Sequence, residues 1–180
     1  MNRVLIAGFG PFNGVIDNPS AAIAEALDGC IYNGVAVVGR EMPVSHRRSI
    51  ELCAMARASV DPVAILGIGV ALSRTAVTIE DWASRPSDVG KEDIDGHAVP
   101  VLDGTEPERR QSTIDGAKLA QLLDADLGDD AGDYVCNSWL FQAVGAFDIP
   151  VGFIHIPPTG LDPAKLLVAV GQIWGCDDGR

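Results

Sequence analysis

The chain has little positive charge. Its 180 residues carry 13 Lys and Arg against 25 Asp and Glu, which gives a formal net charge of −12. Nucleic-acid backbones and anionic membranes are both bound through clustered Lys and Arg. We therefore expect neither a nucleic acid nor a membrane surface as a partner.

Long apolar runs and paired cysteines are missing as well. The sequence has no run near the ~20 residues that a membrane-spanning helix needs, and its apolar start breaks at Gly8 without the pattern of a cleavable signal. The four cysteines, none of them in a CxxC pair, are Cys30, Cys53, Cys136 and Cys176. This spacing argues against a zinc site and against a dense disulfide framework. We expect a cytoplasmic protein with free thiols.

The composition that is present is that of an ordinary globular protein. Hydrophobic residues make up 47% of the chain and charged residues 21%, so a substantial core can be buried. The length fits one domain, and the sequence shows no internal repeat, low-complexity tract or linker. We predict a single domain over residues 1–180.

Short apolar runs alternate with helical patterns along the chain. The predicted strands lie at residues 4–7, 35–38, 63–66, 76–79 and 151–156. The predicted helices lie at residues 19–27 after an Asn18 cap, from a Ser45 cap to residue 56, at 113–127, from 136 or 137 to 147, and at 163–174. Residues 84–108 are rich in Pro, Gly and Asp and indicate an irregular excursion, a loop or a hairpin. The alternation is typical of an α/β fold with a largely parallel sheet.

A glycine-rich turn follows the first predicted strand, but it does not fit a dinucleotide-binding turn. Asn13 stands where a third glycine is needed, Pro11 has no N–H to offer a phosphate, and Arg40 stands where an acid is needed. Ligand sites in open α/β sheets lie beyond the carboxyl ends of the strands. We expect Phe9 and Phe12 to wall an apolar pocket there.

One cysteine, one histidine and one glutamate suggest nucleophilic catalysis. Cys136 precedes a helical pattern, and the N–H groups and dipole of a helix N-terminus stabilise a thiolate. His155 lies near the end of the next strand and Glu80 follows an earlier one, so helix-then-strand geometry can bring them to one edge of the sheet. A thiol with a histidine base and an orienting carboxylate fits acyl transfer. By residue type and spacing alone, a buried cysteine, a structural histidine and a surface glutamate stay open as the alternative.

Five motifs follow one another along the chain: Phe9-Gly10-Pro11-Phe12 with Asn18-Pro19-Ser20, Met42-Pro43-Val44-Ser45, residues 74–80, Tyr134-Val135-Cys136-Asn137 and residues 152–157. In this order they resemble the pyroglutamyl peptidase I family, cysteine peptidases that remove N-terminal pyroglutamate. The resemblance runs from residue 3 to about residue 160. It implies a three-layer α/β/α sandwich around a largely parallel (mixed) sheet. It also implies a cytosolic enzyme without metal or other cofactor, which in this family is often a homo-oligomer.

The resemblance also implies roles for single residues. Cys136 would be the nucleophile, His155 the general base and acid, and Glu80 the group that orients the imidazole. Arg74 would help backbone N–H groups of the Cys136 helix to stabilise the oxyanion. The candidates for substrate contact are Phe9, Phe12, Tyr134 and Val135 around the uncharged lactam ring, with Asn18 as a polar anchor or simply a helix cap.

The sequence departs from the family near the site. Residues 70–73 replace a Gly-rich stretch before Arg74, the segment after Glu80 is shorter, and Asp133 replaces a threonine. Two alternatives therefore stay open beside a pyroglutamyl peptidase. One is an amidase that uses the same triad on another small acyl substrate, and the other is a non-catalytic binding homologue.

Overall fold

The computed structural model describes residues 1–88 and 91–175, so Cys176 lies outside the described residues. The strands of the central sheet are β1 (Asn2–Phe9), β2 (Ile31–Tyr32), β3 (Val35–Met42), β4 (Ala64–Val70), β5 (Thr78–Glu80), β8 (Asp126–Gly128) and β9 (Val151–Ile156). A separate hairpin consists of β6 (Trp82–Ser84) and β7 (Arg109–Gln111). The helices are α1 (Pro19–Leu27), α2 (Arg48–Val60), α3 (Gly116–Leu123), α4 (Val135–Ala146) and α5 (Pro163–Trp174).

The central sheet is mixed and largely parallel, as predicted. Its strand order is β2-β3-β1-β4-β9-β5-β8. β1 pairs in parallel with β3 and β4, as β4 does with β9 and β5 with β8, whereas β2–β3 and β5–β9 are antiparallel. The carboxyl ends of β1, β4 and β9 therefore meet at one edge of the sheet, the position of ligand sites in α/β folds.

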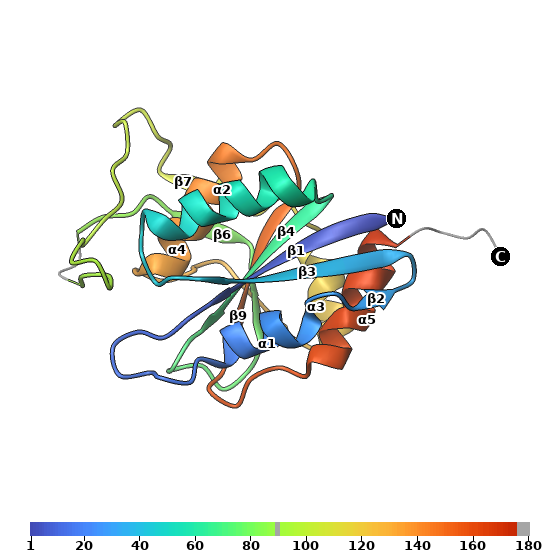
Figure 1. Cartoon of the computed structure of the whole chain (residues 1–180). Coiled ribbons are helices and arrows are strands. Elements are labelled where there is room, and N and C mark those ends of the chain that lie inside the picture. Colours follow the sequence, from blue (N-terminus) through green and yellow to red (C-terminus); the bar gives the residue numbers. More distant parts are fainter. Residues whose placement is uncertain (89–90, 176–180) are drawn as a thin grey trace.

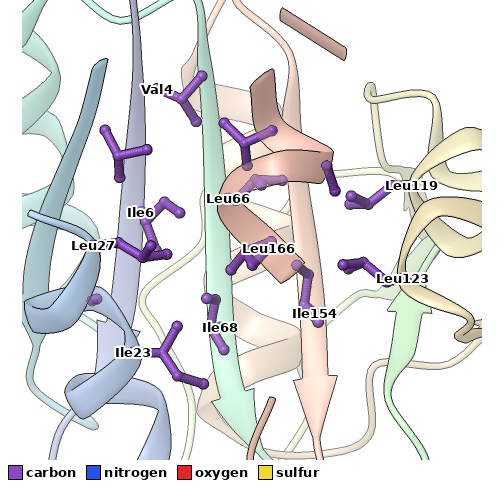
Figure 2. Packing of buried hydrophobic residues seen from close by; sticks show 14 of the residues in the cluster. Val4, Ile6, Ile23, Leu27, Leu66, Ile68, Leu119, Leu123, Ile154 and Leu166 are labelled. Atoms are coloured by element: carbon purple, nitrogen blue, oxygen red, sulfur yellow. The ribbon is translucent and has the colours of Figure 1, made fainter. Parts of the chain in front are cut away.

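Helices cover both faces of the sheet and complete the α/β/α sandwich (Figure 1). α1, α3 and α5 pack together on one face, and α2 and α4 pack together on the other. Neighbouring residues of β1 point to opposite faces, so Val4 and Ile6 join the first layer and Leu5 and Ala7 the second. Figure 2 shows the first layer, where labelled side chains of β1, β4 and β9 meet those of α1, α3 and α5. Each fully buried aliphatic side chain of this kind stabilises the fold by roughly 1.5–3 kcal/mol.

Two helices begin as the sequence predicts. Oδ1 of Asn18 accepts a hydrogen bond from the N–H of Ser20 at 3.1 Å, and the α5 cap Asp162 accepts one from Ala164 at 2.9 Å. Each cap is followed by a proline whose missing N–H is not needed in the first turn. Oγ of Ser45 accepts from the N–H of Arg48 at 3.1 Å, although α2 itself starts later than predicted.

Three predictions about the elements are wrong in part. The helix predicted at 113–127 spans only Gly116–Leu123, because Asp124 adopts a left-handed conformation (φ 53°) that ends it. The chain then forms β8, an edge strand that was missed, as was the short strand β2. On α2, not every apolar residue faces the core: Leu52 and Met55 are 41% and 67% exposed. Ile50, Cys53 and Ala56 pack against the core on the α4 side.

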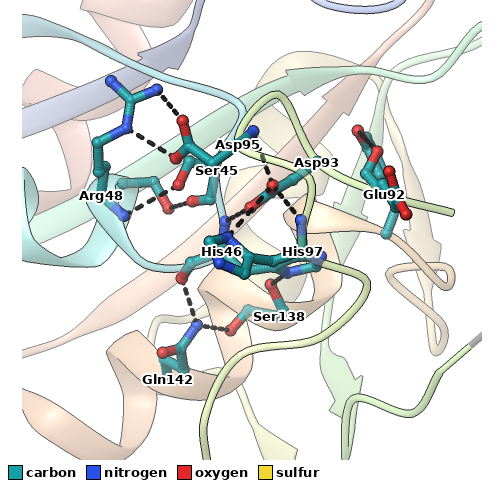
Figure 3. A network of polar contacts seen from close by, with 11 residues as sticks. Ser45, His46, Arg48, Glu92, Asp93, Asp95, His97, Ser138 and Gln142 are labelled. Carbon is teal, nitrogen blue, oxygen red and sulfur yellow. Dashed lines mark hydrogen bonds and ion pairs between the residues drawn. The ribbon is translucent and has the colours of Figure 1, made fainter.

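The predicted excursion is held against the start of α2 by a polar network (Figure 3). It leaves β6 and returns at β7, which pair as an antiparallel hairpin. The buried carboxylate of Asp93 accepts hydrogen bonds from the backbone N–H groups of His46, Asp95 and His97. Asp95 forms a two-point contact with the guanidinium of Arg48 at 2.7 and 2.8 Å. The excursion is thus fixed to the start of α2 rather than left as a free loop.

Within residues 1–88 and 91–175, none of the helices combines the length and the apolar character that crossing a membrane requires.

Candidate active site

The sheet brings the three predicted catalytic side chains to one place. Glu80 is the last residue of β5, His155 lies in the antiparallel neighbour β9, and Cys136 is the second residue of α4. Cys136 and His155 line the same cavity of about 230 Å³. The fold therefore brings together three residues that are far apart in the sequence. The alternative of a surface glutamate is wrong, because Glu80 is buried.

The contact between Glu80 and His155 is short and buried. Nδ1 of His155 lies 2.7 Å from Oε1 of Glu80, and the two residues are 5% and 0% exposed. Burial lowers the pKa of His155, but hydrogen bonds with Cys136 and Glu80 and their negative charges outweigh it and raise this pKa to about 9. Because Nδ1 faces the carboxylate, Nε2 is the ring nitrogen left for the thiol.

Cys136 occupies the first turn of α4, where backbone N–H groups lack helical acceptors. Tyr134, the N-cap residue, contributes no side-chain cap hydrogen bond to this turn. The N–H groups and the helix dipole can therefore stabilise negative charge on the sulfur, or on an oxygen bound beside it. The site thus holds a half-buried thiol, a buried imidazole and a fully buried carboxylate.

Arg74 joins Glu80 to the loop before α4. Its Nη2 atom lies 2.6 Å from Oε1 of Glu80 and donates a second hydrogen bond to the carbonyl of Asp130 at 3.1 Å. Arg74 also lines the cavity of Cys136 and His155. Its predicted help to the oxyanion therefore stays a prediction, and the contact with Glu80 is an addition that the sequence did not predict.

The predicted substrate contacts fall into two groups. Phe9 and Val135 are 2% and 0% exposed and belong to the core on the α4 side, so the expectation that they wall a pocket is wrong. Asn18 is 5% exposed; it caps α1 and donates to the carbonyl of Gly10 at 2.8 Å. Phe12 and Tyr134 face each other with ring centroids 6.2 Å apart, and Tyr134 lines the cavity of Cys136. These two remain the aromatic candidates for substrate contact.

Two glycines shape the site and were missed. A Cβ atom at Gly69 would lie 2.7 Å from Sγ of Cys136, and one at Gly128 would lie 2.3 Å from Oε2 of Glu80. Either contact is closer than side chains allow, so the sulfur and the carboxylate occupy space that only glycine leaves free. Glycine inside a strand marks a close approach of this kind, and Gly69 interrupts the apolar run of β4. That interruption is the signal in the sequence that could have revealed it.

A lysine near the nucleophile was also missed. Nζ of Lys91 lies 2.7 Å from both carboxylate oxygens of Asp133, the residue that departs from the family pattern. Both side chains are half exposed. No sequence pattern pairs residues so far apart, so only the path of the excursion reveals this contact.

The described residues contain no group of three or more His, Cys, Asp or Glu side chains that could hold a metal ion. A thiol at a helix start, a histidine and a buried carboxylate on an α/β/α sheet are together the arrangement of a cysteine hydrolase.

Comparison with known proteins places the chain within this class. The family model for pyroglutamyl peptidase matches residues 2–162. A pyrrolidone-carboxylate peptidase of Mycobacterium marinum is 32% identical over 172 residues, which cover 87% of this chain and 78% of that protein. One of Escherichia fergusonii is 31% identical over the same shares of both chains. The chain belongs to the pyroglutamyl peptidase family, as its motifs predict.

Solved structures confirm the fold. The pyrrolidone carboxyl peptidase from Thermococcus litoralis superimposes with a TM-score of 0.84 at 24% identity, covering 95% of this chain and 90% of that one. A mutant pyrrolidone carboxyl peptidase from Pyrococcus furiosus gives 0.80 at 27% identity, with 93% and 94% covered.

Proposed function

We propose that this chain is a cysteine peptidase that hydrolyses the amide bond after an N-terminal pyroglutamyl residue. The observation that carries the proposal is the buried 2.7 Å contact between His155 and Glu80 beside Cys136, in a chain that matches the family over residues 2–162. The same arrangement argues against a non-catalytic binding homologue. Ligand binding alone does not require a thiol beside a histidine that is paired with a buried carboxylate.

The proposed reaction starts from the Cys136 thiolate beside the imidazolium of His155, a pair that forms when the thiol gives its proton to Nε2. The thiolate then attacks the carbonyl carbon of the pyroglutamyl amide. The oxyanion that forms accepts hydrogen bonds from first-turn N–H groups of α4. His155 gives its proton to the leaving amine as the C–N bond breaks, which leaves a thioester on the sulfur.

The second half of the reaction returns the enzyme to its starting state. Neutral His155 takes a proton from water, the hydroxide attacks the thioester, and pyroglutamate leaves as the thiol is restored. Glu80 keeps Nδ1 protonated throughout, so Nε2 remains the nitrogen that exchanges protons. The substrate is a peptide or a small amide, and the chemistry assigns no step to a metal or other cofactor.

A turnover assay with matched fluorogenic amides tests the proposal. We expect the pyroglutamyl amide to be cleaved at least about tenfold faster than alanyl and prolyl amides. Cys136→Ala should lower turnover to the uncatalysed rate, with Cys53→Ala as the matched control, because Cys53 is buried and does not line the cavity of Cys136 and His155. Equal activity of Cys136→Ala and the parent would overturn the mechanism. Preference for another acyl group would indicate the related amidase, and binding without turnover the non-catalytic homologue.

We also propose that the enzyme acts in the cytoplasm and without nucleic acid or membrane as partner. Its net charge of −12 and its free thiols support this setting. A homo-oligomer stays a prediction from the family resemblance.

A further inference from the structure

Both polar contacts that fix the carboxylate of Glu80 among the described residues are made by one of its oxygen atoms. Its Oε1 atom receives both Nδ1 of His155 at 2.7 Å and Nη2 of Arg74 at 2.6 Å. Among the residues that the structure describes, Oε2 finds no hydrogen-bond partner, and it lies against Gly128, whose Cβ position would be 2.3 Å away. The carboxylate is fully buried. Its orientation toward His155 therefore depends on the two groups that share Oε1.

Arg74 is also bound to the segment that carries the nucleophile. The same Nη2 atom donates to the carbonyl of Asp130 at 3.1 Å, six residues before Cys136. Its side chain is 29% exposed and lines the cavity that Cys136 and His155 line. One guanidinium nitrogen thus joins the buried acid to the loop that leads into α4.

We propose that Arg74 is a positioning residue, which fixes Glu80 against His155 and ties it to the loop before Cys136. This inference deepens the proposed function and rests on it for the identity of the triad. A buried carboxylate needs a compensating charge, and an imidazole that is neutral for part of the cycle supplies one only intermittently. Arg74 remains charged in every step.

The charges of the site support this role. The charged or titratable groups around Arg74 are Glu80 on β5, His155 on β9, Tyr134 and Cys136 at the start of α4, and Asp130 and Asp133 in the loop before it, Asp133 with its partner Lys91. When Cys136 is a thiolate and His155 an imidazolium, these two charges and those of Arg74 and Glu80 sum to zero. The Asp133–Lys91 pair is neutral by itself. Loss of Arg74 leaves a net negative site, which favours protonation of the thiol and of the imidazole alike.

The proposal predicts a shift of the whole pH profile. In Arg74→Gln, thiolate formation and the final loss of the imidazolium proton should both require higher pH, by ~1 unit. The direct readout is the rate at which iodoacetamide alkylates Cys136, followed by mass spectrometry of its peptide between pH 5 and 10. Burial raises the pKa of the Cys53 thiol to about 12, so this cysteine does not compete. The assay needs no substrate, so it keeps its meaning if the pyroglutamyl amide is not cleaved.

Two further variants separate positioning from fold maintenance. Arg74→Lys keeps the charge, but its ammonium nitrogen lies one bond nearer the backbone than Nη2 and should not reach Glu80 and the Asp130 carbonyl in the same geometry. The profile should therefore stay in place while kcat falls and KM changes little. Arg109→Gln is the matched control, because Arg109 holds the carbonyl of the adjacent Asp129 and stacks on Trp82 on a strand outside the site. It should loosen the same loop without moving the profile.

The outcomes decide the proposal. A profile of Arg74→Gln that coincides with the parent, or one that Arg109→Gln reproduces, would overturn it. If Arg74→Gln does not fold, Arg74→Lys carries the test: an unmoved profile with lower kcat supports the role, and unchanged kcat at every pH refutes it. Lack of pyroglutamyl turnover in the parent protein would overturn the proposed function alone.

Discussion

Two histidines of this protein are buried to almost the same extent, but their pKa values are shifted in opposite directions. His155 is 5% exposed and His46 is 3% exposed. Hydrogen bonds with Cys136 and Glu80 raise the pKa of His155 despite its burial, whereas burial dominates at His46 and lowers its pKa. The difference lies in the partner that each ring nitrogen meets, and depth below the surface does not decide it.

The two rings also serve different parts of the molecule. Nδ1 of His46 lies 2.6 Å from the hydroxyl of Ser138, and its backbone N–H donates to Asp93 of the excursion (Figure 3). Its ring packs edge-on against Tyr134, with centroids 6.1 Å apart. A neutral hydroxyl partner suits a histidine that joins an excursion to α4. A carboxylate partner suits one that must accept and release a proton.

Substitution by asparagine should separate the two histidines most strongly. His155→Asn removes the base and acid of the proposed reaction, so kcat should fall by at least about 10²-fold. His46→Asn keeps an amide near Ser138, and we expect a loss below about tenfold, mainly in KM through the excursion and Tyr134. Steady-state kinetics with a pyroglutamyl amide measure both. Equal losses in kcat would remove the functional distinction between the two rings.

The same pair should make stability depend on pH in two opposite directions. The folded-state pKa of His155, about 9, exceeds its ordinary value of 6.5. The stabilisation of the folded state by this proton is therefore complete below pH 6.5 and is lost as the pH rises through about 9. The pKa of His46 is lowered, so its contribution is complete above pH 6.5 and is lost on acidification. Urea unfolding from pH 5 to 10 should show a flatter alkaline limb in His155→Asn and a flatter acid limb in His46→Asn. Parallel limbs in the parent and both variants would contradict this assignment.

The smallest effect should come from Asp133 and its partner Lys91. Both lie near the site and are half exposed, so their pair contributes little and is screened by salt. Asp133→Thr should move the acid limb of kcat/KM to lower pH by less than ~0.5 unit. Lys91→Gln should move it the other way, because it leaves Asp133 uncompensated.

The double variant provides the control. If the two side chains act only as a neutral pair, its acid limb should coincide with that of the parent protein. Coincident limbs in all four proteins would show that Asp133 does not influence the nucleophile.

The sequence predicted the central strands and two helix starts because their signals are local, whereas Glu80, Cys136 and His155 were assigned their roles through the family motifs. Apolar runs mark the buried strands β1, β4 and β9, and Asn18 and Asp162 carry their cap signal within two residues. β8 could not be predicted, since its three residues follow a helix whose end depends on a single left-handed residue, Asp124.

The missed parts of the site depend on distant contacts. Arg74 bonds a carbonyl 56 residues away, and Lys91 meets a carboxylate 42 residues away. The burial of Phe9 follows from the ring contacts with Trp139 and Phe153, which no periodicity near residue 9 reports. A resemblance to a family supplies residue roles, but it does not supply the partners of the residues.

The position of β9 in the sheet has a consequence for folding. This strand is late in the chain, yet it lies between β4 and β5, and the contact of His155 with Glu80 joins residues 75 apart. Contacts between distant residues form slowly, because a long loop must close before they bring any gain. Neither the acid nor the base can act until β9 has entered the gap between its neighbours. Recovery of activity during refolding therefore reports closure of the sheet, and it should lag behind the helical signal that α1 and α5 can give earlier.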